Sequence, residues 1–227
     1  MYQRDYNNWL EYSVNTLEKN PIIKKIFMNF MKSIQPGLCD ISIKRDKKNL
    51  NVDQIAKNFP EELQRFLKGG EAEVIDVKLD YGKFIIGLND ESNGIQKLFE
   101  LLCPIIDILF NGKILICDEI ETSLHPNIVL EIIKLFKYSR KEEFAQLIFS
   151  THDTSLLDLN LFRRDQIWFT ELKPEDRSTD LYSLAELKNV RKDENVCKGY
   201  ISGKYGAIPM LNANLIEDIN KETINIE

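Results

Sequence analysis

Two short apolar runs, each ending in polar groups, constrain the fold of this chain most strongly. Residues 113–117 lead into two adjacent carboxylates, Asp118 and Glu119, and residues 145–150 lead to His152. Each run is β-branched and nearly continuous, which is typical of a strand buried on both faces of a parallel sheet. The working groups of open α/β sheets lie at the carboxyl ends of such strands. Because neighbouring strands are about 4.8 Å apart, we expect Glu119 and His152 to converge within about 10 Å on one cleft.

The rest of the pattern predicts an α/β protein with an N-terminal helical and antiparallel β region. Two successive helices are expected in 7–32, with Pro21 in the first turn of the second, and further helices in 60–67, 90–110 and 126–137. Strands are expected in 39–44, 74–79, 83–88, 113–117, 145–150, 166–170 and 181–184. After residue 88 helices and strands alternate, which favours a mainly parallel sheet flanked by helices. The predicted division is a preceding region at 1–88, a principal domain at 89–209 and a tail at 210–227.

Composition excludes several classes of protein. The chain of 227 residues is 43% apolar and 29% charged, as is usual for a folded domain. Its net charge of −6 gives no basic footprint, so nucleic acid is an unsupported partner. No apolar run approaches the roughly 18 residues of a membrane span, and the first residues lack the core of a signal peptide. The four cysteines are widely spaced. We therefore expect a cytoplasmic protein without a structural zinc site.

The carboxylate pair has a chemical interpretation and a simpler one. At the end of a strand, Asp118 can hold a magnesium ion through water, and Glu119 can polarise the water that attacks a γ-phosphate. Alternatively, the pair is a solvated junction between strand and loop. Residues 91–94 are also open to two interpretations. Ser92, Asn93 and Gly94 begin a helix whose N–H groups and dipole favour a phosphate, or Asp90 or Ser92 is a plain N-cap.

A phosphate-binding P-loop is missing from the sequence. Such a loop reads Gly-x-x-x-x-Gly-Lys-Ser/Thr, because its backbone amides, lysine and hydroxyl group surround the β- and γ-phosphates. Gly-Lys occurs at 82–83, 112–113 and 203–204, and each pair is followed by Phe, Ile or Tyr.

The residues after Glu119 extend the pattern. The stretch 121–126 reads Glu-Thr-Ser-Leu-His-Pro. It resembles the D-loop of ABC-type ATPases, and it is most similar to the bacterial ATPases of the overcoming-lysogenization-defect and abortive-infection groups. The resemblance covers about 90–209 and lacks the acidic residue that transporters have after Leu124. It implies the C-terminal half of an ABC-type ATPase head, without its Walker A half.

The resemblance also implies a role for each candidate residue. Asp118 would be the Walker B metal ligand and Glu119 the catalytic base, while His152 would sense the γ-phosphate. The signature motif, which binds the ATP held by the other subunit, would be Ser92, Asn93 and Gly94, with Asn93 in place of its first Gly. D-loop contacts across a dimer would involve Ser123 and His125.

The implied cofactors and partners depend on the missing half. ATP and Mg²⁺ would bind only if a P-loop is supplied by a longer protein or by a partner. Partners would be a second copy or a complementary ATPase half, together with an effector protein in phage defence. The alternative is a non-catalytic interaction module derived from such an ATPase. A metal-dependent nuclease would use Asp118, Glu119, Glu121 and Asp153, but the chain lacks the Asp-x-Asp pair of that class.

Overall fold

The computed structural model describes residues 7–49, 71–138, 145–188, 190–191 and 193–209. The chain divides into two compact units, Met1–Thr151 and His152–Glu227. The predicted helix at 60–67 and the predicted tail at 210–227 lie outside the described residues. In the part of the chain that is described, no helix has both the length and the apolarity needed to cross a membrane.

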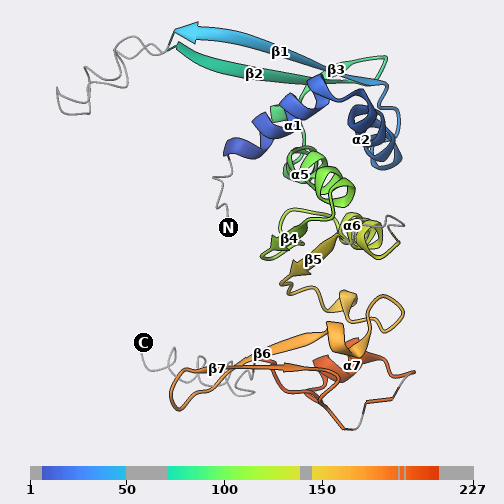
Figure 1. The fold of residues 1–227 in the computed structure, drawn as a ribbon, viewed down its shortest axis with the longest axis vertical. Coiled ribbons are helices and arrows are strands. Elements are labelled where there is room, and N and C mark those ends of the chain that lie inside the picture. Colours follow the sequence, from blue (N-terminus) through green and yellow to red (C-terminus); the bar gives the residue numbers. More distant parts are fainter. Residues whose placement is uncertain (1–6, 50–70, 139–144, 189, 192, 210–227) are drawn as a thin grey trace, which may run out of the picture. The chain divides into compact units, whose positions relative to one another are not determined.

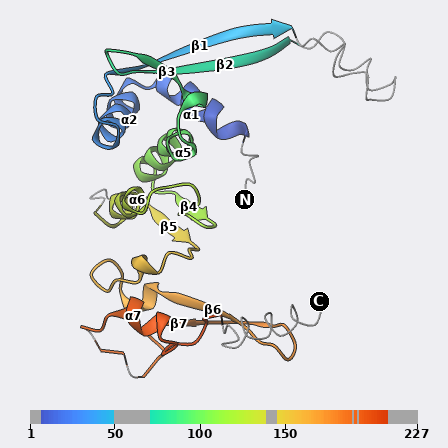
Figure 2. The same ribbon diagram turned by 180° about the vertical axis from the view of Figure 1, so that it is seen from behind.

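The first unit begins with two helices under an antiparallel sheet. Helices α1 (Asn7–Lys19) and α2 (Pro21–Ile34) meet at Asn20, whose side chain caps α2 while Pro21 occupies its first turn. Strands β1 (Asp40–Asn49), β2 (Glu71–Asp80) and β3 (Ile85–Gly87) pair in that order, each antiparallel to the next. The long β1–β2 ribbon lies across α1 and α2 when seen from either side (Figures 1 and 2). The antiparallel N-terminal region is therefore confirmed.

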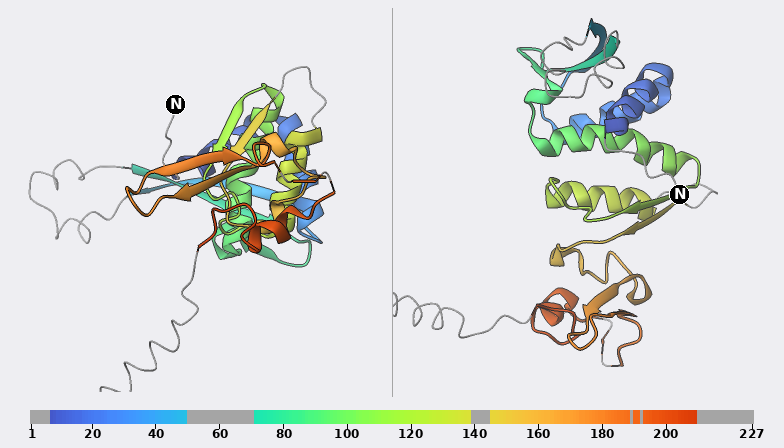
Figure 3. Two further views of the ribbon diagram at one scale, coloured as in Figure 1. Left: turned by 90° about the horizontal axis from the view of Figure 1, so that it is seen from below. Right: turned by 90° about the vertical axis from the view of Figure 1, so that its left-hand side faces the viewer.

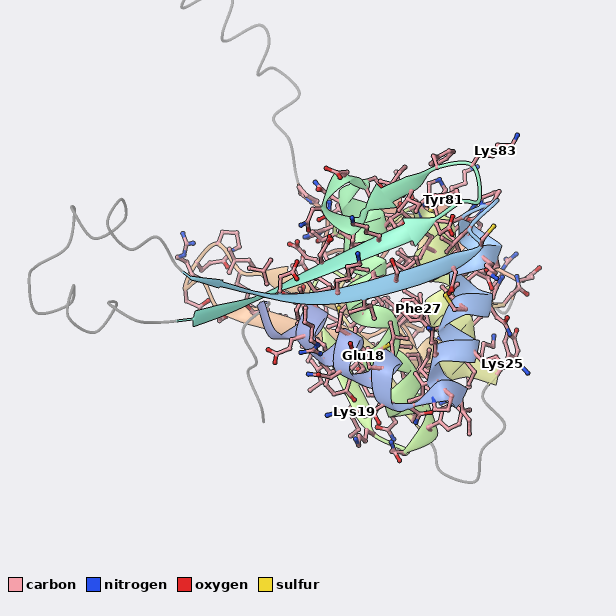
Figure 4. The ribbon with its side chains drawn as sticks, turned by 90° about the horizontal axis from the view of Figure 1, so that it is seen from above. Glu18, Lys19, Lys25, Phe27, Tyr81 and Lys83 are labelled. Carbon is pink, nitrogen blue, oxygen red and sulfur yellow. The ribbon has the colours of Figure 1, made fainter. Side chains whose placement is uncertain are left out.

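Helix α5 (Asn93–Phe110) is the centre of the first unit. Its fully buried residues include Leu98, Phe99 and Leu102. The rings of Phe99 and Phe27 meet edge to face at 5.1 Å, with Phe27 lying beneath the ribbon (Figure 4). Arg45 on the ribbon donates to Asn15 at 2.7 Å and to Glu18 at 2.9 Å, which ties β1 to α1. The position of α5 is thus fixed by packing against the elements that precede it.

Strands β4 (Ile114–Cys117) and β5 (Gln146–Phe149) pair in parallel, as the sequence predicted. Helix α6 (Pro126–Tyr138) connects them and contacts β5. The expectation that both faces of these strands are buried is wrong. Ile114, Ile116 and Ile148 lie on one face and are 57%, 66% and 55% exposed. The alternate residues of the two strands are partly buried, so among the described residues the pair is covered on one face only.

The second unit is built on an antiparallel ribbon. Strands β6 (Trp168–Leu172) and β7 (Thr179–Ser183) pair with each other, and helix α7 (Val196–Ile201) lies beside them (Figures 1 and 3). The core contains Phe169, Leu184 and Val196. Lys204, Tyr205 and the Arg191 amide hydrogen-bond to Glu194, and together they lower the pKa of its carboxyl group to about 2. The predicted hairpin at 181–184 is confirmed, and β6 pairs with β7 rather than continuing the parallel sheet.

Candidate functional site

At the carboxyl ends of β4 and β5, the adjacent residues Asp118 and Glu119 meet Ser150 of the neighbouring strand. The pairing continues past both strands, because the Ser150 amide donates to the Cys117 carbonyl at 3.1 Å and the Ile120 amide donates to the Ser150 carbonyl at 3.2 Å. Ser150 therefore lies beside Asp118 and Glu119. Its hydroxyl oxygen accepts from the Glu119 amide at 2.9 Å and donates to Oδ1 of Asp118. One hydroxyl group thus contacts both residues of the carboxylate pair.

Glu119 has an uncommon backbone conformation. Its φ of 46° lies in the left-handed region, which residues with a Cβ rarely adopt. The Thr122 amide donates to the Glu119 carbonyl at 2.9 Å, and the Thr122 hydroxyl donates to the Glu119 carboxylate at 3.1 Å. Strain of this kind persists where surrounding contacts determine the conformation, and it is frequent at functional sites. Both Asp118 and Glu119 are exposed.

The predicted signature residues lie at the first turn of α5. Ser92 is the N-cap, and its hydroxyl oxygen accepts from the Ile95 amide at 3.4 Å. The prediction that Ser92 is an N-cap is therefore confirmed. Phosphate binding by Ser92, Asn93 and Gly94 stays a prediction. Both Ser92 and Asn93 are exposed.

The start of α5 packs against the loop that follows Glu119. A Cβ on Gly94 would lie 2.7 Å from the backbone oxygen of Ser123, so the helix approaches closer than a side chain allows. Lys97 donates to the Thr122 carbonyl at 2.6 Å. Ser123 itself has a φ of 64°. The structure therefore brings Gly94 and Ser123 into contact, which sequence spacing did not indicate.

The two histidines lie in different places. His125 precedes α6, and its Nδ1 accepts from the Asn127 amide at 3.2 Å, so this exposed side chain helps to cap the helix. His152 is exposed and is the first residue of the second unit, three residues after the end of β5. Its convergence with Glu119 stays a prediction.

The residues present fit one part of an ATPase site. Mg²⁺ is normally held by one or two carboxylates together with phosphates and water, and Asp118 at the end of a strand suits that role. No cluster of three or more His, Cys, Asp or Glu side chains able to hold a metal occurs among the described residues. A site formed by protein ligands alone, such as the nuclease alternative requires, therefore lacks support there.

The Gly-Lys pairs do not supply a phosphate cradle. Gly112-Lys113 leads into β4 rather than a helix, and Lys113 pairs with Asp107 at 2.8 Å, which raises the pKa of the lysine. Lys204 pairs with Glu194, and Gly82-Lys83 lies between β2 and β3. In a P-loop the lysine opens a helix and stays available to phosphate. None of the three described pairs has that arrangement.

Three contacts escaped sequence reasoning: those made by Ser150, Thr122 and Lys97. A hydroxyl at the end of the strand next to the carboxylates was a usable signal for Ser150. For Thr122 and Lys97 no sequence pattern identified the partner. The Thr122 contact depends on the turn at Glu119, and the Lys97 contact depends on how α5 meets the loop.

Comparisons with known proteins bear on the family of this chain. A family model described as "AAA domain, putative AbiEii toxin, Type IV TA system" matches residues 17–158, more than half of the chain. No curated protein matches. A solved structure titled as the structural biochemistry of ATP-driven dimerization and DNA-stimulated activation of SMC ATPases superposes with a TM-score of 0.43. Its identity to this chain is 16%, over 75% of this chain and 88% of that one. The match over residues 17–158 places this chain in the AbiEii-type family of AAA ATPase domains.

Proposed function

We propose that this chain supplies the Walker B, signature and switch-histidine part of an ABC-type ATP hydrolase. The P-loop would lie outside this sequence, in a longer form of the protein or in a partner chain. The observation that carries the proposal is the pair Asp118 and Glu119 at the carboxyl end of a parallel strand, held by Ser150 of the neighbouring strand. Working groups of α/β sheets gather at this edge.

Each residue has a role in the proposed site. The Asp118 carboxylate would orient water molecules around Mg²⁺. When bound, this ion would neutralise the charge that develops on the phosphates. The Glu119 carboxylate would accept a proton from the attacking water. His152 would donate a hydrogen bond to the γ-phosphate. In a dimer, the amides at the start of α5 would face the nucleotide of the other copy, next to Ser123 and His125.

The exposed apolar face of β4 and β5 supports the proposal that another half of the ATPase completes this sheet. Parallel sheets are normally covered on both faces, yet Ile114, Ile116 and Ile148 are more than half exposed. A P-loop strand would pair with the edge of this sheet, and the helix that follows it would cover the exposed face. The family description names a type IV toxin–antitoxin system. In keeping with it, we propose that the ATPase drives a toxic effector in phage defence.

The test is complementation by a P-loop polypeptide. The chain alone should show no Mg²⁺-dependent ATP turnover, because P-loop contacts provide most of the phosphate positioning. The DNA next to its own gene should encode a frame with a P-loop, and adding that polypeptide should restore turnover. Ile116→Asp should prevent complementation by placing a charge on the covered face.

Ile22→Asp is the matched control, because Ile22 is 65% exposed on α2. It should complement like the wild type. Robust turnover by the chain alone would contradict the proposal. A P-loop polypeptide that binds without restoring turnover would favour the non-catalytic interaction module.

A further inference from the structure

We infer that Ser150 is a positioning residue that sets the orientation of both Asp118 and Glu119 through one hydroxyl group. The inference rests on the proposed ATPase function, in which those two carboxylates act on the metal and on water. It assigns a role to a residue that carries no charge and precedes the predicted switch histidine by two positions.

The backbone of Ser150 is fixed independently of its side chain. Its amide donates to Cys117 at 3.1 Å and its carbonyl accepts from Ile120 at 3.2 Å, so hydrogen bonds flank the carboxylate pair on both sides. The position from which the Ser150 side chain extends is therefore fixed at the end of β5. Neither bond involves the side chain, so we expect both to persist when Ser150 is substituted.

The hydroxyl group uses both of its hydrogen-bonding functions. Its oxygen accepts a hydrogen bond from the Glu119 N–H at 2.9 Å, and its O–H donates a hydrogen bond to Oδ1 of Asp118. The direction of one bond fixes the direction of the other, because a hydroxyl group has one proton. Asp118 keeps Oδ2 as its second acceptor, which suits a ligand of metal-bound water.

The bond to the Glu119 amide bears on the backbone conformation there. At φ 46° the chain is in a region that glutamate rarely occupies, and the orientation of the amide depends on its acceptor. Without the Ser150 hydroxyl, the exposed amide can turn to water, and the residue can relax toward commoner conformations. The Glu119 carboxylate would then leave the position that Thr122 and Ser150 define together.

The first test measures the conformation without nucleotide. Amide hydrogen exchange of the full chain by NMR should show Glu119 exchanging about tenfold faster in Ser150→Ala, the change expected from losing one hydrogen bond. Ser150→Thr keeps the hydroxyl and should match the wild type. Ser33→Ala, whose hydroxyl donates to Phe30 on α2, is the control and should leave Glu119 exchange unchanged. Unchanged exchange in Ser150→Ala would overturn the inference. If that variant does not fold, Ser150→Cys replaces it, with a similar volume and a weaker hydrogen-bonding group.

The second test uses the protein completed by its P-loop half. Ser150→Ala should lower kcat by roughly 10- to 100-fold and leave KM for ATP nearly unchanged, because the carboxylates act in the transition state. Ser150→Thr should restore kcat. Wild-type kcat in Ser150→Ala beside an inactive Glu119→Gln would overturn the Ser150 inference alone. Wild-type turnover in Glu119→Gln would instead overturn the proposed function.

Discussion

The glycine at position 94 allows α5 to approach the backbone of the carboxylate-bearing loop closely. At Gly94 a Cβ would lie 2.7 Å from the Ser123 backbone oxygen, well inside van der Waals contact. The atom it meets belongs to the backbone of a residue in the left-handed region, so it cannot move aside like the end of a flexible side chain. Contact between the predicted signature and D-loop residues therefore depends on glycine at this position.

Gly94→Ala should accordingly lower the free energy of unfolding of the first unit. Overpacking of this kind typically costs about 1–3 kcal/mol. Urea denaturation measures the change, with Asn93→Ala as the matched control because Asn93 is the exposed neighbour on the same helix turn. The control should stay within about 0.5 kcal/mol of the wild type. Equal stability of the two variants would show that the helix and loop are not in contact.

At the scale of elements, α5 contains a defect that a neighbouring helix repairs. Pro104 lies inside α5 and has no N–H, so the Glu100 carbonyl loses its partner four residues ahead. The Ser13 hydroxyl on α1 donates to that carbonyl at 2.7 Å, and Ser13 is fully buried. The Glu100 carbonyl, which Pro104 leaves without a partner in the helix, is thus satisfied by a tertiary contact with α1.

Ser13→Ala should destabilise the first unit by about 1–3 kcal/mol, because it leaves the partly buried Glu100 carbonyl without its donor. In a Pro104→Ala background the cost should shrink, since the backbone amide that alanine supplies at this position can donate to the Glu100 carbonyl instead. A double-mutant cycle in urea measures this coupling, with Ser33→Ala as an exposed serine control. The same loss of stability in both backgrounds would show that Ser13 does not replace the hydrogen bond that Pro104 removes.

Sequence patterns predicted most elements because local signals and burial agreed there. Pro21 marked the start of α2, and the apolar runs marked β4 and β5. The ribbon extends past the predicted strand at 39–44, because residues 45–49 are mostly charged or polar and take strand form through pairing with β2. The predicted two-faced burial of β4 and β5 is wrong, because the face with Ile114, Ile116 and Ile148 is more than half exposed.

The candidate site, like the fold, could be predicted from the sequence only in part. The place of Asp118 and Glu119 at the end of a parallel strand could be predicted, because the apolar run that precedes them marks that strand. The contact of Thr122 could not be predicted, since it depends on the left-handed turn at Glu119. The Ser150 hydroxyl at the end of the neighbouring strand was a signal that sequence reasoning did not use.

At the scale of the whole molecule, the two compact units divide the proposed machinery. The first unit contains α5, the carboxylate pair and Ser150, and the second begins at His152. The family match spans 17–158 and so includes every predicted site residue. The proposed metal ligand and catalytic base therefore belong to the first unit, and His152, whose role stays a prediction, is the first residue of the second.

The most direct measurement of the central claim is ATP turnover in the completed protein with Glu119→Gln. The amide preserves the shape of the side chain and removes the proton acceptor, so ATP binding should persist while turnover falls by roughly 10² or more. Glu131→Gln on α6, an exposed carboxylate paired with Lys134, is the control and should keep wild-type turnover. Wild-type turnover in Glu119→Gln would contradict the assignment of this residue as the catalytic base and, with it, the proposed site.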